Sequence, residues 1–297
     1  MRSLTLDTRV ILEARPPRNA VDPTLPHACF VEQEFCGDGT IEDVTTIIGI
    51  NRECPFRCLM CDLWRNTTPR GTPDGIVAGQ VKHALQEIPW TPHVKFYNAG
   101  NFFDEKAVSP SDRDRIAELV NDRRTLVIEN HPRLIDQRCI EYALAISPRL
   151  EVAMGLETVD PSVLPRLNKG MTLDDFERAC HLLSDHHIGI RAFILLRTPW
   201  QTEQEGVHWA KRSIAWAFDA GVECCVIIPT RAGNGIMDQL QESSEFTPPS
   251  IDSLEEVHSW GIEQGRGRVF ADTWDIDRTG CDTAAIHAMN LHQETPQ

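Results

Sequence analysis

The stretch that decides the fold reads Asn51-Arg52-Glu53-Cys54-Pro55-Phe56-Arg57-Cys58-Leu59-Met60-Cys61-Asp62-Leu63-Trp64. Its three cysteines follow the spacing C-x3-C-x2-C, and no fourth cysteine follows nearby. Thiolate sulfur is a preferred ligand of iron, and a short loop can turn three such sulfurs inward. The spacing therefore predicts that Cys54, Cys58 and Cys61 bind three corners of a [4Fe-4S] cluster and leave the fourth iron open.

Two other interpretations of these cysteines stay open. Core cysteines could fall at this spacing by accident, or a zinc ion could bind them together with Cys36, Cys29 or a distant histidine. Zinc knuckles usually pair their cysteines as C-x2-C, whereas the first gap here holds three residues. In the zinc interpretation the protein is a non-catalytic binding module. A ferredoxin, in contrast, would need a fourth thiolate.

Short apolar runs alternate with helical patterns over most of the chain. The first run, 44–50, directly precedes the cysteines, and the others cover 93–97, 125–128, 150–156, 190–196, 224–228 and 269–273. Thr172-x-x-Asp175 and Thr202-x-x-Glu205 are typical helix starts between them. Runs that are apolar at most positions are typical of parallel strands covered by helices. We therefore expect an α/β protein, a full or partial (β/α) barrel with parallel strands and outer helices.

The chain is expected to divide into three segments. Residues 1–43 are scattered with prolines and predict an irregular N-terminal extension with at most a short strand near residues 9–12. Residues 44–276 form the barrel domain, and 277–297 form a C-terminal tail. Within the barrel, segment 233–250 is rich in Gly, Asn, Ser and Pro and predicts a loop over the active face.

Charge and composition exclude several classes of protein. The chain has 29 Lys and Arg against 44 Asp and Glu, a formal charge of −15, which argues against a broad nucleic-acid-binding face. No run approaches the 18 apolar residues of a membrane span, and the first residues lack the apolar core of a signal peptide. We therefore expect a cytoplasmic protein whose ten cysteines are reduced.

In parallel barrels the chemistry lies at the carboxyl ends of the strands, and many polar residues fall there. Among them, Glu129 and His131 are candidates for contact with substrate or cofactor, with capping of the next helix as the alternative. Asp272 and Asp275 flank Trp274 and predict either a substrate-positioning carboxylate or a turn. Cys281 is a substrate-side thiol or a cysteine without a role. The other polar residues at these ends are Asn51, Asn98, Asn101, Asn130, Glu157, Thr158, Arg197, Thr230 and Arg231.

The cysteine triplet after a first barrel strand resembles the signature of radical S-adenosylmethionine (SAM) enzymes, and the resemblance covers residues 44–275. Gly155-Leu156-Glu157-Thr158-Val159-Asp160 and Leu167-Asn168-Lys169-Gly170-Met171-Thr172 look like the elongator and methylthiotransferase branch, and more closely like the archaeosine-synthase radical SAM subunit and its relatives. The resemblance implies that the open iron binds SAM and that one electron from the cluster cleaves SAM to a 5′-deoxyadenosyl radical. It also implies an electron donor such as ferredoxin or flavodoxin.

The resemblance also implies residues that bind SAM. Met60 stands where the family usually has an aromatic residue beside the adenine. Asn98 and Gly100 stand in place of a Gly-Gly-Glu-like turn at the SAM amine, without its acid. Glu157 matches a position that accepts hydrogen bonds from SAM hydroxyls. Arg191 is expected at the SAM carboxylate or, alternatively, in an ion pair on the outer face of the sheet.

We therefore expect a radical SAM enzyme that modifies an unidentified substrate. The −15 charge and the absence of an appended RNA-binding domain favour a small molecule or a lipid. The alternative is modification of a transfer RNA base, as in the archaeosine-synthase subunit, with a partner that delivers the RNA. Nucleic-acid binding by this chain alone is not expected.

Overall fold

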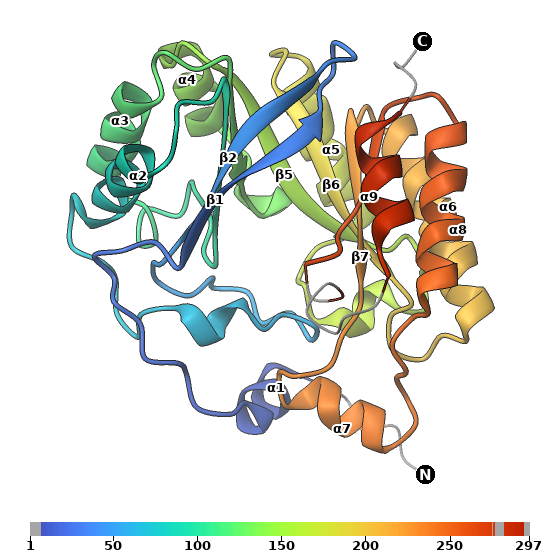
Figure 1. Ribbon diagram of the computed structural model, residues 1–297. Coiled ribbons are helices and arrows are strands. Elements are labelled where there is room, and N and C mark those ends of the chain that lie inside the picture. Colours follow the sequence, from blue (N-terminus) through green and yellow to red (C-terminus); the bar gives the residue numbers. More distant parts are fainter. Residues whose placement is uncertain (1–6, 275, 277–281, 294–297) are drawn as a thin grey trace.

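One sheet of eight strands curls into a partial barrel, with the strands in the order in which they occur in the chain (Figure 1). The computed structural model describes residues 7–274, 276 and 282–293. Strand β1 runs antiparallel to β2, and all later neighbours pair in parallel. The strands are β1 (Ala28–Phe35), β2 (Ile41–Gly49), β3 (His93–Asn98), β4 (Thr125–Glu129), β5 (Arg149–Glu157), β6 (Gly189–Leu196), β7 (Cys224–Pro229) and β8 (Arg268–Ala271).

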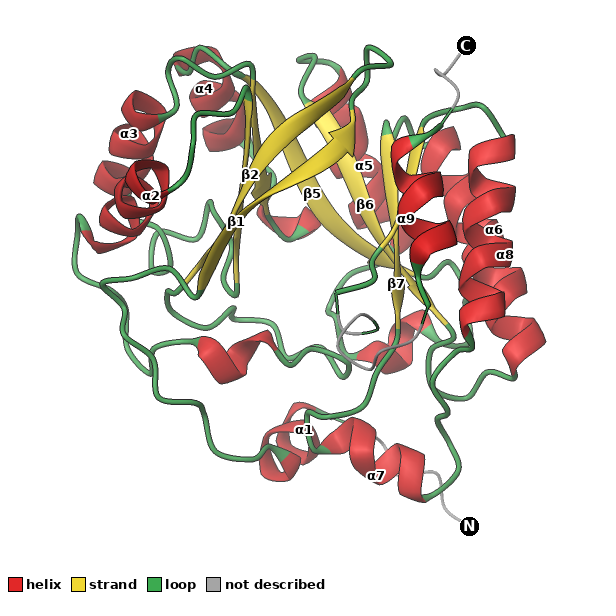
Figure 2. Ribbon diagram, viewed as in Figure 1, coloured by secondary structure: helices red, strands yellow, loops and turns green. Residues whose placement is uncertain are grey.

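The seven strands expected from apolar runs are all present as β2 to β8, so the predicted α/β fold is confirmed in its partial-barrel form. Helices lie on the outer side of the curled sheet, and loops gather at the carboxyl ends of the strands (Figure 2). The helices are α1 (Thr8–Ala14), α2 (Ile76–Glu87), α3 (Pro110–Leu119), α4 (Gln137–Ala145), α5 (Leu173–Ser184), α6 (Glu203–Asp219), α7 (Ile236–Glu242), α8 (Ile251–Glu263) and α9 (Ala284–Leu291). Both predicted capping boxes open their helices, at Thr172 for α5 and at Thr202 for α6.

The N-terminal segment is more ordered than its prolines indicate. The short strand expected near residues 9–12 is wrong, because these residues belong to α1, whose N-terminus is capped by the Asp7 carboxylate. Strand β1 also falls in the segment expected to be irregular, and it extends the sheet by pairing along β2. Its stability comes from that pairing rather than from a strong apolar pattern of its own. In the expected loop 233–250, residues Ile236–Glu242 form α7.

A second hydrophobic core, which we call the lower core, lies below the carboxyl ends of the strands. It joins α1 and α7, which lie side by side in Figure 1, to the cysteine loop. Gly235 permits this contact, because a Cβ atom there would lie 2.0 Å from the Ala14 carbonyl oxygen. The buried members of the lower core are Ile11, Leu59, Val163, Leu167, Leu195, Ile236, Met237, Leu240 and Phe246.

Helix α9 covers the open side of the barrel, where it contacts both β1 and β8. The side-chain amide of Asn290 bonds to the N–H and the carbonyl of Ala271, at 2.9 and 3.0 Å. Gln293 makes the same two bonds with Val269, at 2.9 and 2.7 Å. These amides satisfy the exposed edge of β8 as a neighbouring strand would. Among the residues that the structure describes, none of the helices combines the length and the apolar character needed to cross a bilayer.

Candidate active site

The three cysteines of the motif lie in the loop that follows β2, and hydrogen bonds fix this loop from three sides. The Cys54 N–H donates to Ala99 O at 3.2 Å, which ties the loop to the turn after β3. The Leu59 N–H donates to Leu167 O at 2.8 Å. The Asn234 side chain donates to Leu59 O at 2.8 Å. Residues distant in the sequence therefore determine where the cysteines lie.

The three cysteines of the motif are partly buried. Burial raises the pKa of Cys58 to about 11, while the nearby Lys169 ammonium acts in the opposite direction. Burial also raises the pKa of Cys61, and the neighbouring Cys58 and Cys54 thiols add to that effect. The Asn101 side-chain amide donates to the Cys54 sulfur at 3.1 Å. Since the thiols are neutral when nothing is bound, a ligand that requires thiolates must displace their protons.

The spacing of these sulfurs bears on the zinc alternative. A single tetrahedral zinc ion would hold its sulfur ligands about 3.8 Å apart. Among the described residues, Cys54, Cys58 and Cys61 do not form a group whose ligand atoms all lie within 4.8 Å of one another. In an iron-sulfur cluster each cysteine binds a different iron, so wider spacing is expected. In the ligand-free chain the three sulfurs are therefore not arranged for a single zinc ion.

Buried polar side chains without partners surround the carboxyl ends of the strands. They follow or end β2, β3, β6 and β7, and their side-chain oxygen or amide atoms make no hydrogen bond within the described chain: Asn51, Asn98, Thr198 and Thr230. An unpaired buried polar group costs about 1–3 kcal/mol, so native proteins place such groups where a ligand satisfies them. These amides and hydroxyls fit a polar ligand such as SAM. Thr198 lies one residue beyond the Arg197 that sequence reasoning placed at this strand end.

Glu157 ends β5 in a strained conformation and is paired with a lysine. Its φ of 66° lies in the left-handed region, after a register shift in the pairing of β5 with β6. Lys169 Nζ donates to Glu157 Oε1 at 2.6 Å, and both side chains are buried. A Cβ atom at Gly155 would lie 2.1 Å from that oxygen, so only glycine leaves room for the carboxylate. Strain of this kind clusters at functional sites.

Lys169 is the functional candidate that sequence reasoning did not identify. Burial opposes its charge, but Glu157 and the Cys58 and Cys54 thiols raise the pKa of the ammonium above its usual value. The ammonium thus bonds to the Glu157 carboxylate and also interacts electrostatically with the cysteines. The segment Leu167–Thr172 indicated a family resemblance, but no spacing rule pairs its lysine with Glu157.

Glu129 and His131, both at the end of β4, have different surroundings. Burial raises the pKa of Glu129 to about 7, and the carboxylate accepts one weak hydrogen bond, from the Asn98 N–H at 3.4 Å. Burial lowers the pKa of His131 to about 3, so its ring is neutral. The ring stacks on Phe56 with 3.6 Å between centroids. Its Nδ1 accepts from the Arg133 N–H, and Nε2 donates to Lys169 O. His131 thus supports the cysteine loop, while Glu129 retains free acceptor capacity.

Arg191 forms ion pairs, as the alternative expectation had it, but not on the outer face of the sheet. It lies in the first half of β6 inside the barrel, not on the outer face. Its guanidinium donates to Glu151 and to Glu34, at 2.6 Å each. The guanidinium that was expected to bind the SAM carboxylate is thus paired with two buried carboxylates of the protein.

The remaining predicted residues lie close to the site or outside the described chain. A Cβ atom at Gly100 would lie 2.9 Å from Arg52 O, so this glycine lets the turn after β3 approach the cysteine loop. Met60 is partly buried against the lower core. The Asp272 carboxylate accepts the Trp274 N–H at 3.0 Å, which is turn geometry. Asp275 and Cys281 lie outside the described residues.

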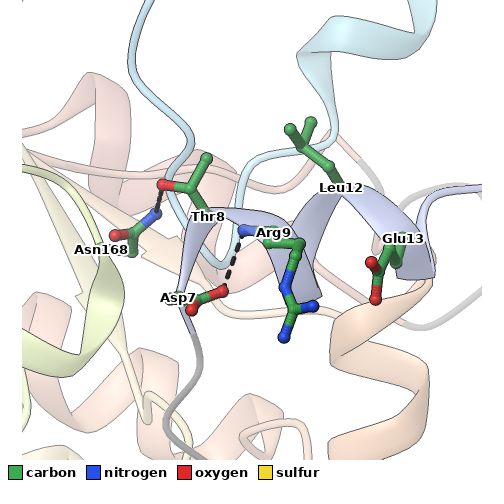
Figure 3. Close-up of a pocket in the computed structure, with 6 residues that line it drawn as sticks. All are labelled: Asp7, Thr8, Arg9, Leu12, Glu13 and Asn168. Atoms are coloured by element: carbon green, nitrogen blue, oxygen red, sulfur yellow. Dashed lines mark hydrogen bonds between the residues drawn. The ribbon is translucent and has the colours of Figure 1, made fainter.

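A surface depression beside α1 is separate from the strand ends (Figure 3). Its lining includes Asn168, whose side chain donates to Thr8 Oγ1 at 3.1 Å and to Arg57 O at 2.7 Å. This amide links α1 to the cysteine loop, so the depression marks a structural contact. The lining residues are Asp7, Thr8, Arg9, Leu12, Glu13 and Asn168.

Comparisons with known proteins agree with this geometry, although no protein-family model matches the chain. The chain is 29% identical over 214 residues to archaeosine synthase subunit beta of Thermococcus kodakarensis, covering 68% of this chain and 65% of that protein, less than two thirds of its length. It is 23% identical over 256 residues to an uncharacterized protein of Methanocaldococcus jannaschii, covering 81% and 70%.

Solved structures show the same fold. Methylornithine synthase (PylB) superposes with a TM-score of 0.55 at 11% identity, over 75% of this chain and 63% of that one. The archaeal Elp3 of Methanocaldococcus infernus superposes with a TM-score of 0.54 at 15% identity, over 76% and 56%. Both have the partial barrel described above.

Proposed function

We propose that the chain is a radical SAM enzyme that assembles a [4Fe-4S] cluster on Cys54, Cys58 and Cys61 and cleaves SAM reductively. The observation that carries this proposal is that the three partly buried thiols and the unpartnered polar groups both lie at the carboxyl ends of the strands. A cluster held by three cysteines needs a neighbouring polar ligand for its open iron, and those groups would hold that ligand.

The chain's own residues supply binding and orientation. When bound, the reduced cluster supplies the electron that cleaves SAM to a 5′-deoxyadenosyl radical. Asn98 and Asn51 offer amide groups at the ends of β3 and β2, and Gly100 allows close approach of the backbone. Glu157, oriented by Lys169, accepts hydrogen bonds from ligand hydroxyls. Glu129 can hold a proton itself or accept one from a substrate group. Met60, which packs partly against the lower core, would lie beside the adenine.

Lys169 also balances charge at the site. Three thiolates beside a cluster form an anionic centre, and the ammonium is already close enough to oppose the raised pKa of the Cys58 thiol. Because the lysine is buried, solvent screens this effect little. The salt bridge to Glu157 therefore connects the cysteine loop to the ligand-binding carboxylate.

Anaerobic reconstitution tests the proposal. Full-length protein supplied with iron, sulfide and a reductant should bind four irons and four sulfides per chain, as the cluster formula requires. With SAM it should then release 5′-deoxyadenosine, measured by chromatography. An intact cluster that binds SAM but releases no 5′-deoxyadenosine would overturn the proposed chemistry. A colourless preparation with zinc bound through three sulfur ligands would instead support the binding module.

Two substrate classes have support. The formal charge of −15 favours a small molecule or a lipid, with a protein electron donor such as ferredoxin or flavodoxin. The name of the Thermococcus relative, archaeosine synthase subunit beta, favours modification of a transfer RNA base with a partner subunit. Titration of the chain with transfer RNA separates them. Tight binding that weakens steeply with salt would favour the RNA substrate.

A further inference from the structure

A second cluster of potential metal ligands lies at the amino end of the parallel strands, where the β1–β2 hairpin meets the start of β3. Cys36 directly follows β1, Glu42 is the second residue of β2, and His93 is the first residue of β3. His93 Nε2 lies 2.8 Å from Glu42 Oε2 and 3.7 Å from Cys36 Sγ. One ligand atom from each of the three residues lies within 4.8 Å of the other two.

Main-chain pairing fixes the positions of these three residues. The Cys36 N–H donates to Thr40 O at 2.8 Å within the hairpin turn. Glu42 is paired with Glu34 across the hairpin, and His93 is paired with Val44 of β2. Cys36 is 8% exposed, and the other two side chains are half-buried. Ligands held by strands rather than by a flexible loop form a preorganised site.

We propose that Cys36, Glu42 and His93 bind one divalent cation of the zinc class, with water as the fourth ligand. One thiolate, one imidazole and one carboxylate are ligands that zinc prefers, and three protein ligands leave one tetrahedral position open. The thiolate and the carboxylate together balance the two positive charges of the ion. The proton of the thiol passes to solvent when the metal binds.

Arg124 supports the site from outside. Its guanidinium contacts both oxygens of Glu42, at 2.7 and 2.8 Å. Ligating carboxylates are usually held by such a second hydrogen bond, which fixes their orientation. With Oε2 on the metal, Arg124 keeps its contact with Oε1. The ion would fasten the β1–β2 hairpin to β3, at the opposite end of the strands from the cysteine motif.

Zinc binding to the full chain tests this proposal, with the iron-sulfur cluster loaded first so that the motif cysteines are occupied. Competition with a chromophoric chelator should show one zinc per chain. X-ray absorption at the zinc edge should show one sulfur ligand and otherwise nitrogen or oxygen. Cys36→Ser and His93→Gln should each weaken binding at least tenfold. Cys29→Ser, on the same strand β1, should leave it unchanged.

The opposite results are equally specific. No bound zinc, or zinc with three sulfur ligands, would overturn the proposal, because the second result would place the metal on the cysteine motif. Equal affinity in wild type and Cys36→Ser would also overturn it. Circular dichroism of both variants identifies loss of fold, and either folded variant suffices for the test. The result does not depend on SAM cleavage. In a protein that loads no cluster, the one-sulfur coordination and the Cys36→Ser comparison still distinguish this site from the cysteine motif.

Discussion

At the amino end of the parallel strands, buried charged side chains inside the barrel satisfy one another, whereas at the carboxyl end buried amides and hydroxyls have no partner in the described chain. Glu151 accepts from Arg191 at 2.6 Å and from Arg268 at 2.8 Å, and Glu34 accepts from Arg191. Burial raises the pKa of Glu151, but the positive charges of Arg191 and Arg268 outweigh this effect and lower the pKa to about 2. Asn98 and Thr230 make no such contacts. We call the first the closed end and the second, where the proposed ligand would bind, the ligand end.

The largest expected effect is loss of the cluster at the ligand end. Cys58→Ser should abolish both the cluster and the release of 5′-deoxyadenosine, because a hydroxyl replaces one of three iron ligands. Iron and sulfide analysis and chromatography measure the two losses. Cys180→Ser, a buried cysteine of α5, should retain both. A Cys58→Ser protein that still cleaves SAM would contradict the assignment of the motif.

The second largest expected effect is a loss of stability at the closed end. Arg191→Met should lower the free energy of unfolding by about 3–5 kcal/mol, because it leaves Glu34 and Glu151 buried with fewer cations. Urea unfolding measures the loss. Arg212→Met, at an exposed position of α6, should change the stability by less than about 0.5 kcal/mol. If Arg191→Met weakened SAM binding and left stability unchanged, the arginine would belong to the ligand end.

The third effect comes from Glu129, whose pKa is raised from 4.5 to about 7 in the folded protein. The folded state then binds more protons than the unfolded state between these values, so stability is highest below about pH 4.5 and falls as the pH rises to about 7. The loss is on the order of 3 kcal/mol in cluster-free protein. Glu129→Gln should remove this part of the pH dependence, measured as the difference between the two urea-unfolding profiles. Identical profiles, or an equal change in the exposed Glu118→Gln, would show that Glu129 ionises normally.

The smallest expected effect concerns a single amide at the ligand end. Asn98→Ala should weaken SAM binding about tenfold, because one ligand hydrogen bond is lost, and should leave the stability of the ligand-free protein nearly unchanged. Equilibrium binding and urea unfolding measure the two quantities. Asn121→Ala, at an exposed position, should alter neither. A destabilised Asn98→Ala protein with normal SAM affinity would mean that Asn98 satisfies the protein rather than a ligand.

Features that depend on neighbouring residues could be predicted from the sequence. The strands β2 to β8 appear as apolar runs, and the capping boxes at Thr172 and Thr202 depend on residues three positions apart. The cysteine motif is equally local. Its position along the chain, directly after the first parallel strand, was enough to indicate the fold.

Features that depend on distant pairing could not be predicted. Strand β1 has only a weak alternation and is stabilised by β2, so its composition indicated an irregular segment. Arg191 lies on β6, which the sequence predicts, but its partner Glu34 lies on β1, which the sequence did not predict. Lys169 reaches Glu157 because Glu157 adopts a positive φ, which the sequence does not reveal.

The lower core has a consequence for when the cysteine loop becomes ordered. Leu59, in that loop, packs in one cluster with Ile11 from the start of the chain and with Ile236 and Phe246 from near its end. The lower core is therefore complete only after Ile236 and Phe246 have left the ribosome. Until then, part of the apolar packing around Leu59 of the cysteine loop is missing. The order of synthesis thus favours iron-sulfur loading of a nearly finished polypeptide over loading of a nascent one.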